Sequence, residues 1–189
     1  MTTLDGRQLA AGLAEVVKIA LVADDRLLEQ IERDSAALAR GSADALIGIV
    51  RAAVEAKIRI VRDDEHERGS RALLNLGHTI GHAIEAQGGY RRWLHGEAVA
   101  LGTVAELRAT AAMGLSPALL VERTERLLSA LGLPTRLDAP ELAAAWPFVA
   151  SDKKRGQGAL RLPVVVGPGK GVVQRVTVHD LRSALLPSG

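Results

Sequence analysis

The chain has 189 residues and a formal net charge of +2; 48% of its residues are hydrophobic, only 2% are aromatic, and cysteine is absent. The lack of cysteine excludes disulfides, thiolate metal sites and cysteine nucleophiles, and the scarcity of aromatic rings argues against a protein that stacks nucleic-acid bases. No apolar run is long enough for a membrane span, and no basic and apolar leader is visible. We therefore expect a cytoplasmic protein with neither nucleic acid nor a membrane as its partner.

Apolar residues recur at helical spacing through the first two thirds of the chain and predict a series of amphipathic helices. Ser42 is the candidate N-cap of the third helix, and Ser116 is the candidate N-cap of the last, with Pro117 at its first helical position. The predicted helices cover residues 8–22, 24–38, 43–61, 70–87, 95–113 and 117–131. The apolar stripe expected in the third helix consists of Ile47, Val50, Val54, Ile58 and Val61.

The last third of the chain has a different pattern, in which two runs rich in β-formers flank a glycine-rich turn and predict a hairpin. The expected elements are a short helix from residue 138, a charged loop at 151–156, strands at 160–166 and 172–178, and a terminal helix at 179–186. The predicted fold class is therefore mainly α: one multi-helix domain over residues 1–189, with a small β-hairpin near its C-terminus.

Side chains with chemical reach gather along the predicted helix at 70–87. Residues three and four apart share one face of a helix, so this helix should present a row of polar side chains, namely Arg71, Asn75, His78 and His82. Gly77 and Gly81 flank the histidines and cost the helix roughly 1 kcal/mol each relative to alanine. Such glycines allow another backbone or a ligand to come close.

The histidines predict a metal site, because two imidazoles and a carboxylate leave an open position on a catalytic Zn²⁺. Spacing alone nominates His78, His82 and one carboxylate, without deciding which carboxylate. His95 starts the next predicted helix, and Glu15 lies between apolar neighbours on the first. The alternatives are a pair of core histidines bonded to backbone groups, and an ordinary i, i+3 surface pair between Glu15 and Lys18.

The cations permit two interpretations. Lys57 at the end of an amphipathic helix is usually solvated, and the run that contains Lys153 and Lys154 is usually an exposed loop. Alternatively, these lysines and Arg71 converge beside the histidines and bind an anionic, phosphorylated substrate next to a metal.

Four motifs follow one another in an order that resembles a known family. They are Ala14-Glu-Val-Val-Lys18, the block from Asp63 through Arg71 to Glu85, Leu94-His-Gly-Glu-Ala-Val-Ala100, and Asp152-Lys-Lys154. This series resembles the C-terminal domain of 3-dehydroquinate synthase, a member of the sugar-phosphate cyclase family, and the similarity extends from about residue 4 to residue 185.

The resemblance implies a specific set of site residues. A divalent metal, Zn²⁺ or another such as Co²⁺, is expected on Glu15, His78 and His95, whereas His82 should face the substrate outside the metal's coordination shell. The positions expected to contact substrate are Lys18, Lys57, Arg71, Asn75, His82 and one of Lys153 and Lys154, with Lys153 favoured. Lys18, Asn75 and His82 are the expected catalytic residues.

The resemblance also implies an activity, the conversion of 3-deoxy-D-arabino-heptulosonate 7-phosphate to 3-dehydroquinate and phosphate in the shikimate pathway. In the family, NAD⁺ is bound by an N-terminal domain, and these 189 residues contain no G-x-G-x-x-G motif and no βαβ unit. We therefore expect no NAD site and no turnover without that half. The expected partners are a phosphorylated sugar acid, an NAD-binding domain or subunit, and a second copy in a homodimer. A related sugar-phosphate cyclase and a non-catalytic metal- or ligand-binding module are the alternatives.

Overall fold

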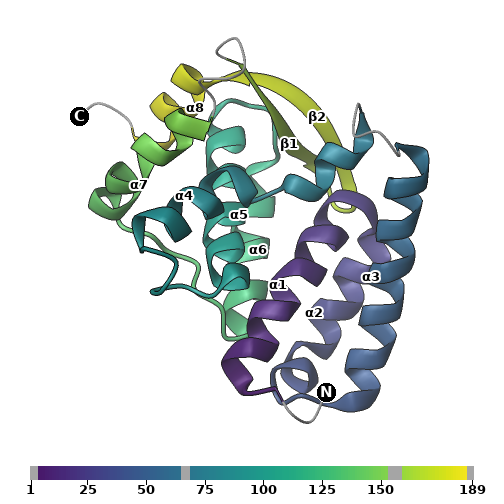
Figure 1. The fold of residues 1–189 in the computed structure, drawn as a ribbon. Helices are drawn as coiled ribbons and strands as arrows, with labels where there is room; N and C mark the ends of the chain where they lie inside the picture. The colour runs from purple at the N-terminus through teal and green to yellow at the C-terminus, as the bar shows by residue number, and fades with distance from the viewer. Residues whose placement is uncertain (1–3, 65–68, 153–158, 187–189) are drawn as a thin grey trace.

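The structure is a computed structural model that describes residues 4–64, 69–152 and 159–186. Its architecture is mainly helical, with a two-stranded antiparallel hairpin near the C-terminus (Figure 1), which confirms the predicted fold class. Across these ranges, no helix has the length and apolar character needed to cross a membrane.

Three helices at the N-terminal end pack against one another: α1 (Gly6–Ala23), α2 (Asp25–Ala39) and α3 (Ala43–Asp63) (Figure 1). The Asp24 side chain accepts a hydrogen bond from the Leu27 amide and so caps α2 where α1 ends. The apolar faces of these helices form most of one hydrophobic cluster. This group carries Glu15 on the side of α1 that faces the middle of the molecule.

The predicted core stripe of α3 is wrong. The buried residues of α3 are Leu46, Ile49, Ala53, Ala56 and Ile60, whereas Ile47, Val54 and Ile58 are 63%, 50% and 43% exposed. The helix has two apolar stripes at helical spacing, and sequence periodicity does not choose between them. The stripe with two alanines faces the core, because small side chains let helices approach closely. Ser42 precedes α3 but makes no capping hydrogen bond with its side chain.

The prediction of a single helix at 70–87 is also wrong. The chain forms a short 3-10 helix, η1 (Ser70–Asn75), and then a separate α-helix, α4 (His78–Gln87). The break falls at Gly77, whose φ is +78°. A Cβ at Gly77 would lie 2.3 Å from the Thr103 hydroxyl oxygen, so only glycine lets the chain turn this close to the next helix. Arg71 and Asn75 therefore do not continue the helical row of His78 and His82.

The next helix, α5 (His95–Ala112), lies at the centre of the molecule (Figure 1) and starts at the predicted residue. Most of its residues are buried, and it contributes side chains to both hydrophobic clusters. It packs against α1, α4, α6 and α8. α6 (Ala118–Ala130) follows, but its N-cap is Pro117, because Ser116 instead donates its hydroxyl hydrogen to Thr110 at 2.8 Å.

The remaining elements cover the other side of α4 and α5. α7 (Ala139–Asp152) is longer than the predicted short helix and includes the first residues of the predicted charged loop. Strands β1 (Ala159–Gly167) and β2 (Lys170–Thr177) pair in antiparallel fashion, and α8 (Val178–Leu185) ends the described chain. The predicted hairpin and terminal helix are thus confirmed.

Candidate metal and anion site

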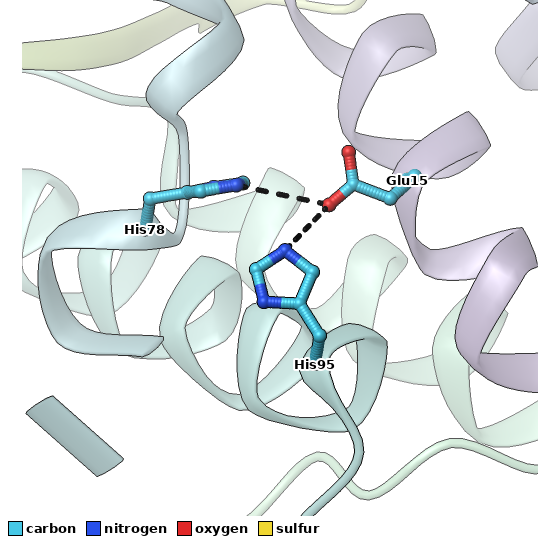
Figure 2. Close-up of side chains that lie close together, drawn as sticks. All are labelled: Glu15, His78 and His95. Atoms are coloured by element: carbon cyan, nitrogen blue, oxygen red, sulfur yellow. Dashed lines mark ion pairs between the residues drawn. The ribbon is translucent and has the colours of Figure 1, made fainter. Parts of the chain in front are cut away.

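Three side chains from separate helices converge where α1, α4 and α5 meet. Glu15 comes from α1, His78 from the first turn of α4 and His95 from the first turn of α5 (Figure 2). The Glu15 Oε1 atom lies 3.8 Å from His78 Nε2 and 3.6 Å from His95 Nε2. One ligand atom from each residue lies within 4.8 Å of the others. The structure therefore brings together the three residues that the resemblance nominated as ligands.

The donor set fits a divalent ion. Two ligands at about 2.1 Å from one ion at the tetrahedral angle are about 3.4 Å apart, and the distances from Glu15 to the two imidazoles are only slightly longer. Glu15 Oε1 is buried and has no hydrogen-bond partner among the described residues. A buried carboxylate oxygen without a partner is costly, and an ion between the two Nε2 atoms would satisfy it.

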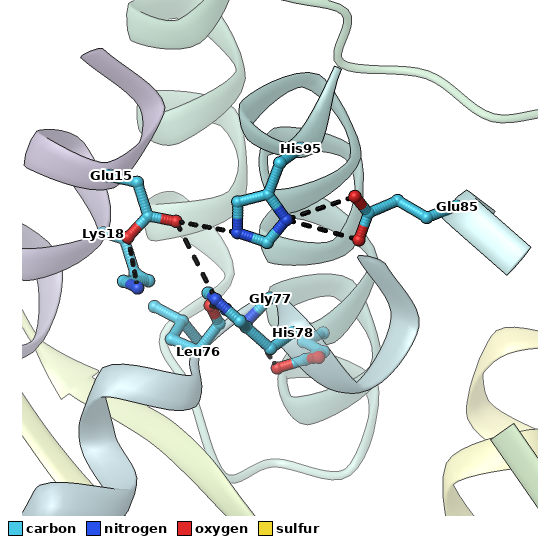
Figure 3. A network of polar contacts seen from close by, with 8 residues as sticks. Glu15, Lys18, Leu76, Gly77, His78, Glu85 and His95 are labelled. Atoms are coloured by element: carbon cyan, nitrogen blue, oxygen red, sulfur yellow. Dashed lines mark hydrogen bonds and ion pairs between the residues drawn. The ribbon is translucent and has the colours of Figure 1, made fainter. Parts of the chain in front are cut away.

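The candidate ligand His78 is held in its neutral form. Its Nδ1 atom lies 3.2 Å from the Leu76 carbonyl oxygen (Figure 3), which can only accept, so the proton belongs on Nδ1 and the Nε2 lone pair faces Glu15. Burial, followed by the charge of Lys18, lowers the pKa of His78 to about 4. The imidazole is therefore uncharged at neutral pH, as a metal ligand must be.

Glu85 contacts His95 and is a candidate site residue that the sequence interpretation missed. Its carboxylate oxygens lie 3.2 and 3.3 Å from His95 Nδ1 (Figure 3), so His95 also presents Nε2 to Glu15. A carboxylate on the far nitrogen of a ligating histidine fixes the ring and raises its basicity. Glu85 belongs to the recognised motif block, but nothing in its spacing connects it to His95, because the contact crosses the loop between α4 and α5.

The described residues contain a second group that could hold an ion, formed by His82, Glu85 and His95. It shares His95 with the first group. Among the described residues, no carboxylate completes a group with both His78 and His82, the pair that helical spacing nominates. Glu15 lies beside His78, whereas Glu85 lies beside His82. The rings of His78 and His82 meet edge to face, with centroids 5.2 Å apart.

Lys18 makes a half-buried ion pair with the candidate ligand Glu15. Its Nζ atom donates to Glu15 Oε2 at 2.6 Å (Figure 3), and its side chain is only 5% exposed, so the interpretation as an ordinary surface pair is wrong. Burial acts to raise the pKa of Glu15, but the charge and hydrogen bond of Lys18, together with the two histidines, lower it overall. Burial also lowers the pKa of Lys18, against the opposing effect of Glu15.

A cavity of about 340 Å³ opens beside this cluster. Its lining includes Lys57, Arg71 and Asn75 together with Lys18 and the three candidate ligands. Arg71 is held in place partly by Asp64, which accepts hydrogen bonds from the amides of Gly69 and Arg71 at 2.7 and 2.9 Å. The cations from three elements thus share one cavity, whereas Lys153 and Lys154 lie outside the described residues. His82 is exposed and close to the histidine rings but does not line the cavity.

Close contacts between α1 and α5 fix the distance from Glu15 to His95. A Cβ at Gly96 would lie 1.9 Å from the Ala11 carbonyl oxygen, so the two helices touch directly beside His95. Arg7 at the start of α1 binds Glu97 through two hydrogen bonds of 2.6 and 2.7 Å. Similarly, a Cβ at Gly81 would lie 3.0 Å from the Ala98 carbonyl oxygen. The glycines around the histidines therefore serve backbone approach, one of the two roles expected for them.

The fold and the candidate ligand set agree with the resemblance to the C-terminal domain of the sugar-phosphate cyclases. Residues 12–155 match the model of the family described as 3-dehydroquinate synthase C-terminal. Because the match covers most of the chain, the protein belongs to this family.

Solved structures of related enzymes have the same fold. ValA, a 2-epi-5-epi-valiolone synthase from Streptomyces hygroscopicus subsp. jinggangensis 5008 solved with NAD⁺ and Zn²⁺ bound, is 28% identical with a TM-score of 0.81, over 97% of this chain and 52% of that one. A 2-deoxy-scyllo-inosose synthase in complex with carbaglucose-6-phosphate, NAD⁺ and Co²⁺ is 24% identical with a TM-score of 0.76, over 100% and 55%. Another structure of 2-deoxy-scyllo-inosose synthase is 22% identical with a TM-score of 0.75, over 98% and 51%. The chain spans about half the length of these proteins.

Proposed function

We propose that this chain is the metal- and substrate-binding half of a sugar-phosphate cyclase, with Glu15, His78 and His95 as ligands of Zn²⁺ or Co²⁺. The observation that carries the proposal is the unpartnered Oε1 atom of Glu15, which lies buried between two imidazole Nε2 atoms. The Zn²⁺ in the valiolone synthase structure and the Co²⁺ in an inosose synthase structure support it. The ion, when bound, supplies a Lewis acid for substrate oxygens.

The cations of the cavity bind the phosphate of the substrate in this proposal. Lys57 and Arg71 approach the cavity from α3 and η1, and a guanidinium can bind two phosphate oxygens at once. Lys18 lines the same cavity and donates to Glu15, and Asn75 offers a neutral donor and acceptor to a sugar hydroxyl. Lys18, Asn75 and His82 are the proposed catalytic residues, with one of Lys153 and Lys154 as a further phosphate contact.

The proposed reaction is that of 3-dehydroquinate synthase, which converts 3-deoxy-D-arabino-heptulosonate 7-phosphate to 3-dehydroquinate and inorganic phosphate. The family model that matches carries this name. The second candidate is a cyclase that makes another carbocycle, and the likeness to a 2-epi-5-epi-valiolone synthase favours it. NAD⁺ would be held by a separate nucleotide-binding half. The chain by itself is therefore proposed not to bind NAD⁺ and not to turn over substrate.

A phosphate-release assay tests this proposal. The chain is incubated with Zn²⁺, NAD⁺ and 3-deoxy-D-arabino-heptulosonate 7-phosphate, with and without a separately supplied nucleotide-binding half of a 3-dehydroquinate synthase, and in parallel with the substrate of 2-epi-5-epi-valiolone synthase. Phosphate release from the first substrate only in the presence of both halves is the expected result. Phosphate release from only the second substrate would contradict the assignment to 3-dehydroquinate synthase. Tight NAD⁺ binding by this chain without the other half would contradict the proposal that a separate half binds NAD⁺.

Binding of inorganic phosphate tests the cation assignment separately. Arg71→Ala should weaken phosphate binding to the metal-loaded chain, because it removes a cation from the cavity. The matched control is Arg126→Ala on α6, an exposed arginine with an i, i+4 partner at 3.7 Å, which should have no effect. Equal phosphate affinity in all three proteins would remove the basis for a phosphate site in this cavity.

A further inference from the structure

A fully buried carboxylate on α5 holds the start of the helix that carries His78. Glu106 is 0% exposed. Its Oε2 atom accepts a hydrogen bond of 2.8 Å from the Gly77 amide, and its Oε1 atom accepts one of 3.2 Å from the Ile80 amide. These two amides lie on either side of His78, which is the first residue of α4. One side chain from another helix thus satisfies two amides at this helix start.

The first turn of α4 cannot supply its own cap. A helix normally begins with a residue whose side-chain oxygen accepts from an amide of the first turn, but here the N-cap position is Gly77. Its φ of +78° disfavours any side chain, and a Cβ would lie 2.3 Å from the Thr103 hydroxyl and 2.7 Å from the Val99 carbonyl oxygen. The buried amides therefore need an acceptor from elsewhere in the chain, and Glu106 is that acceptor.

We propose that Glu106 is a positioning residue for the metal site, which sets the location of His78 through the backbone amides of Gly77 and Ile80. The inference rests on the proposed function, since it takes His78 as a metal ligand. The charge of Glu106 also acts on Lys18, the ion-pair partner of Glu15, but its two printed hydrogen bonds go to the backbone beside His78. It fixes the turn from which His78 bonds the Leu76 carbonyl oxygen through Nδ1 and directs Nε2 toward Glu15.

The geometric demand of a metal explains why this arrangement matters. Ligand distances in a working site agree with the preferred values to within about 0.2 Å, so a small shift of the α4 start displaces His78 from bonding distance. A glutamine at position 106 would keep the size of the side chain but offer one acceptor oxygen and an amide group that only donates. One of the two backbone amides would then face a donor, and the first turn of α4 would move.

Metal titration of Glu106→Gln tests the inference. Zn²⁺ binding measured by calorimetry should weaken by about 10-fold, the lower end of what is seen when partners of ligating residues are removed. The absorption spectrum of bound Co²⁺ should change as well, because the coordination geometry changes. The matched control is Thr110→Val, which lies one turn further along α5 and is 1% exposed. Among the described residues, its hydroxyl group bonds within its own helix and to Ser116. The substitution should lower thermal stability without altering Zn²⁺ affinity or the Co²⁺ spectrum.

Two other results of these measurements would contradict the inference. Wild-type Zn²⁺ affinity and Co²⁺ spectrum in folded Glu106→Gln would overturn it, and so would equal losses in Glu106→Gln and Thr110→Val. If Glu106→Gln does not fold, Glu106→Asp, which keeps the charge but shortens the reach, is measured against the same control with the same criteria.

A metal-free readout separates this inference from the proposed function. If the wild-type chain binds no metal, the proposed metal site fails. The tautomer of His78, read from ¹⁵N–¹H correlation spectra, then decides whether Glu106 positions this ring. A wild-type Nδ1–H signal that changes in Glu106→Gln supports the inference, and one that persists unchanged overturns it.

Discussion

His78 and His82 share one short helix, but their substitution should have different effects on metal binding. His78→Ala removes an imidazole that faces the unpartnered oxygen of Glu15 and should abolish measurable Zn²⁺ binding. His82→Ala should leave the Zn²⁺ affinity nearly unchanged, because His82 is not part of the group formed by Glu15, His78 and His95. Calorimetric titration of both variants checks this. The reverse result would assign the ion to the second group, with His82 and Glu85.

Glu85→Gln should weaken Zn²⁺ binding by about 10-fold through His95, because loss of the carboxylate lowers the basicity of the ring. The neutral amide can still accept from Nδ1, so the protein should keep its fold. Glu125→Gln is a suitable control, since Glu125 of α6 pairs with Arg108 of α5 at 2.7 Å and belongs to neither candidate group of ligands among the described residues. A Zn²⁺ affinity equal to that of the control would show that Glu85 contributes nothing to the metal site.

The identities of the candidate site residues are easier to propose from sequence than the way in which the fold holds them. Glu15, His78 and His95 follow from the motif resemblance, because each lies in a recognisable block. Glu85 gives no local signal, since its partner is reached across a loop, and the burial of Lys18 depends on how α1 packs. Helical spacing alone favoured His78 with His82, which the structure does not combine with one carboxylate.

At the scale of helices, Gly96 should be among the least replaceable residues. Gly96→Ala would place a methyl group 1.9 Å from the Ala11 carbonyl oxygen and force α1 away from α5. Overpacking of this kind typically costs about 1–3 kcal/mol and occasionally more, and here it would also separate Glu15 from His95. Chemical denaturation and Zn²⁺ titration should therefore both show losses.

The control for Gly96→Ala is Gly12→Ala on α1, where nothing lies within 4 Å of the added Cβ. An alanine in an open helical position should stabilise the chain by about 0.5–1 kcal/mol. A Gly96→Ala variant as stable as Gly12→Ala would contradict the close contact between α1 and α5.

The two faces of α3 should respond differently to the same small truncation. Ile49→Val removes a methylene group from a fully buried side chain and should cost about 1 kcal/mol. Ile47→Val makes the same change on a side chain that is 63% exposed and should change the stability by less than about 0.5 kcal/mol. Urea unfolding of both variants compares them directly. A larger effect at Ile47 would restore the stripe that periodicity predicted.

Helix positions were largely predictable, but helix faces and breaks were not. The bounds of α1, α2 and α5 agree closely with the apolar spacing, because periodicity reports where a helix exists. The break at Gly77 depends on a contact with Thr103, which lies far along the chain, and no pattern near residue 77 encodes it. The choice between the two stripes of α3 likewise depends on how closely α1 and α2 can approach.

For the whole molecule, metal binding should raise the thermal stability. The candidate ligands belong to α1, α4 and α5, so the unfolded chain has no preformed site. Zn²⁺ at 100 times its Kd should stabilise the native state by about 2.7 kcal/mol, and a domain of this size gains about 2–4 °C in Tm per kcal/mol. A rise of about 5–10 °C that a chelator reverses is expected in a thermal scan. His78→Ala should show no rise, and an equal rise in that variant would mean that Zn²⁺ binds elsewhere.

The burial of most of α5 has a consequence for the order of folding. A helix with most of its residues buried gains little stabilisation when only one neighbouring helix packs against it, because its apolar residues face several neighbours at once. Those neighbours include α1 and α8, from opposite ends of the chain. Contacts between such distant segments slow the search for the native state. His95 occupies the first position of this helix, so the three candidate ligands come together only when the long-range assembly is nearly finished.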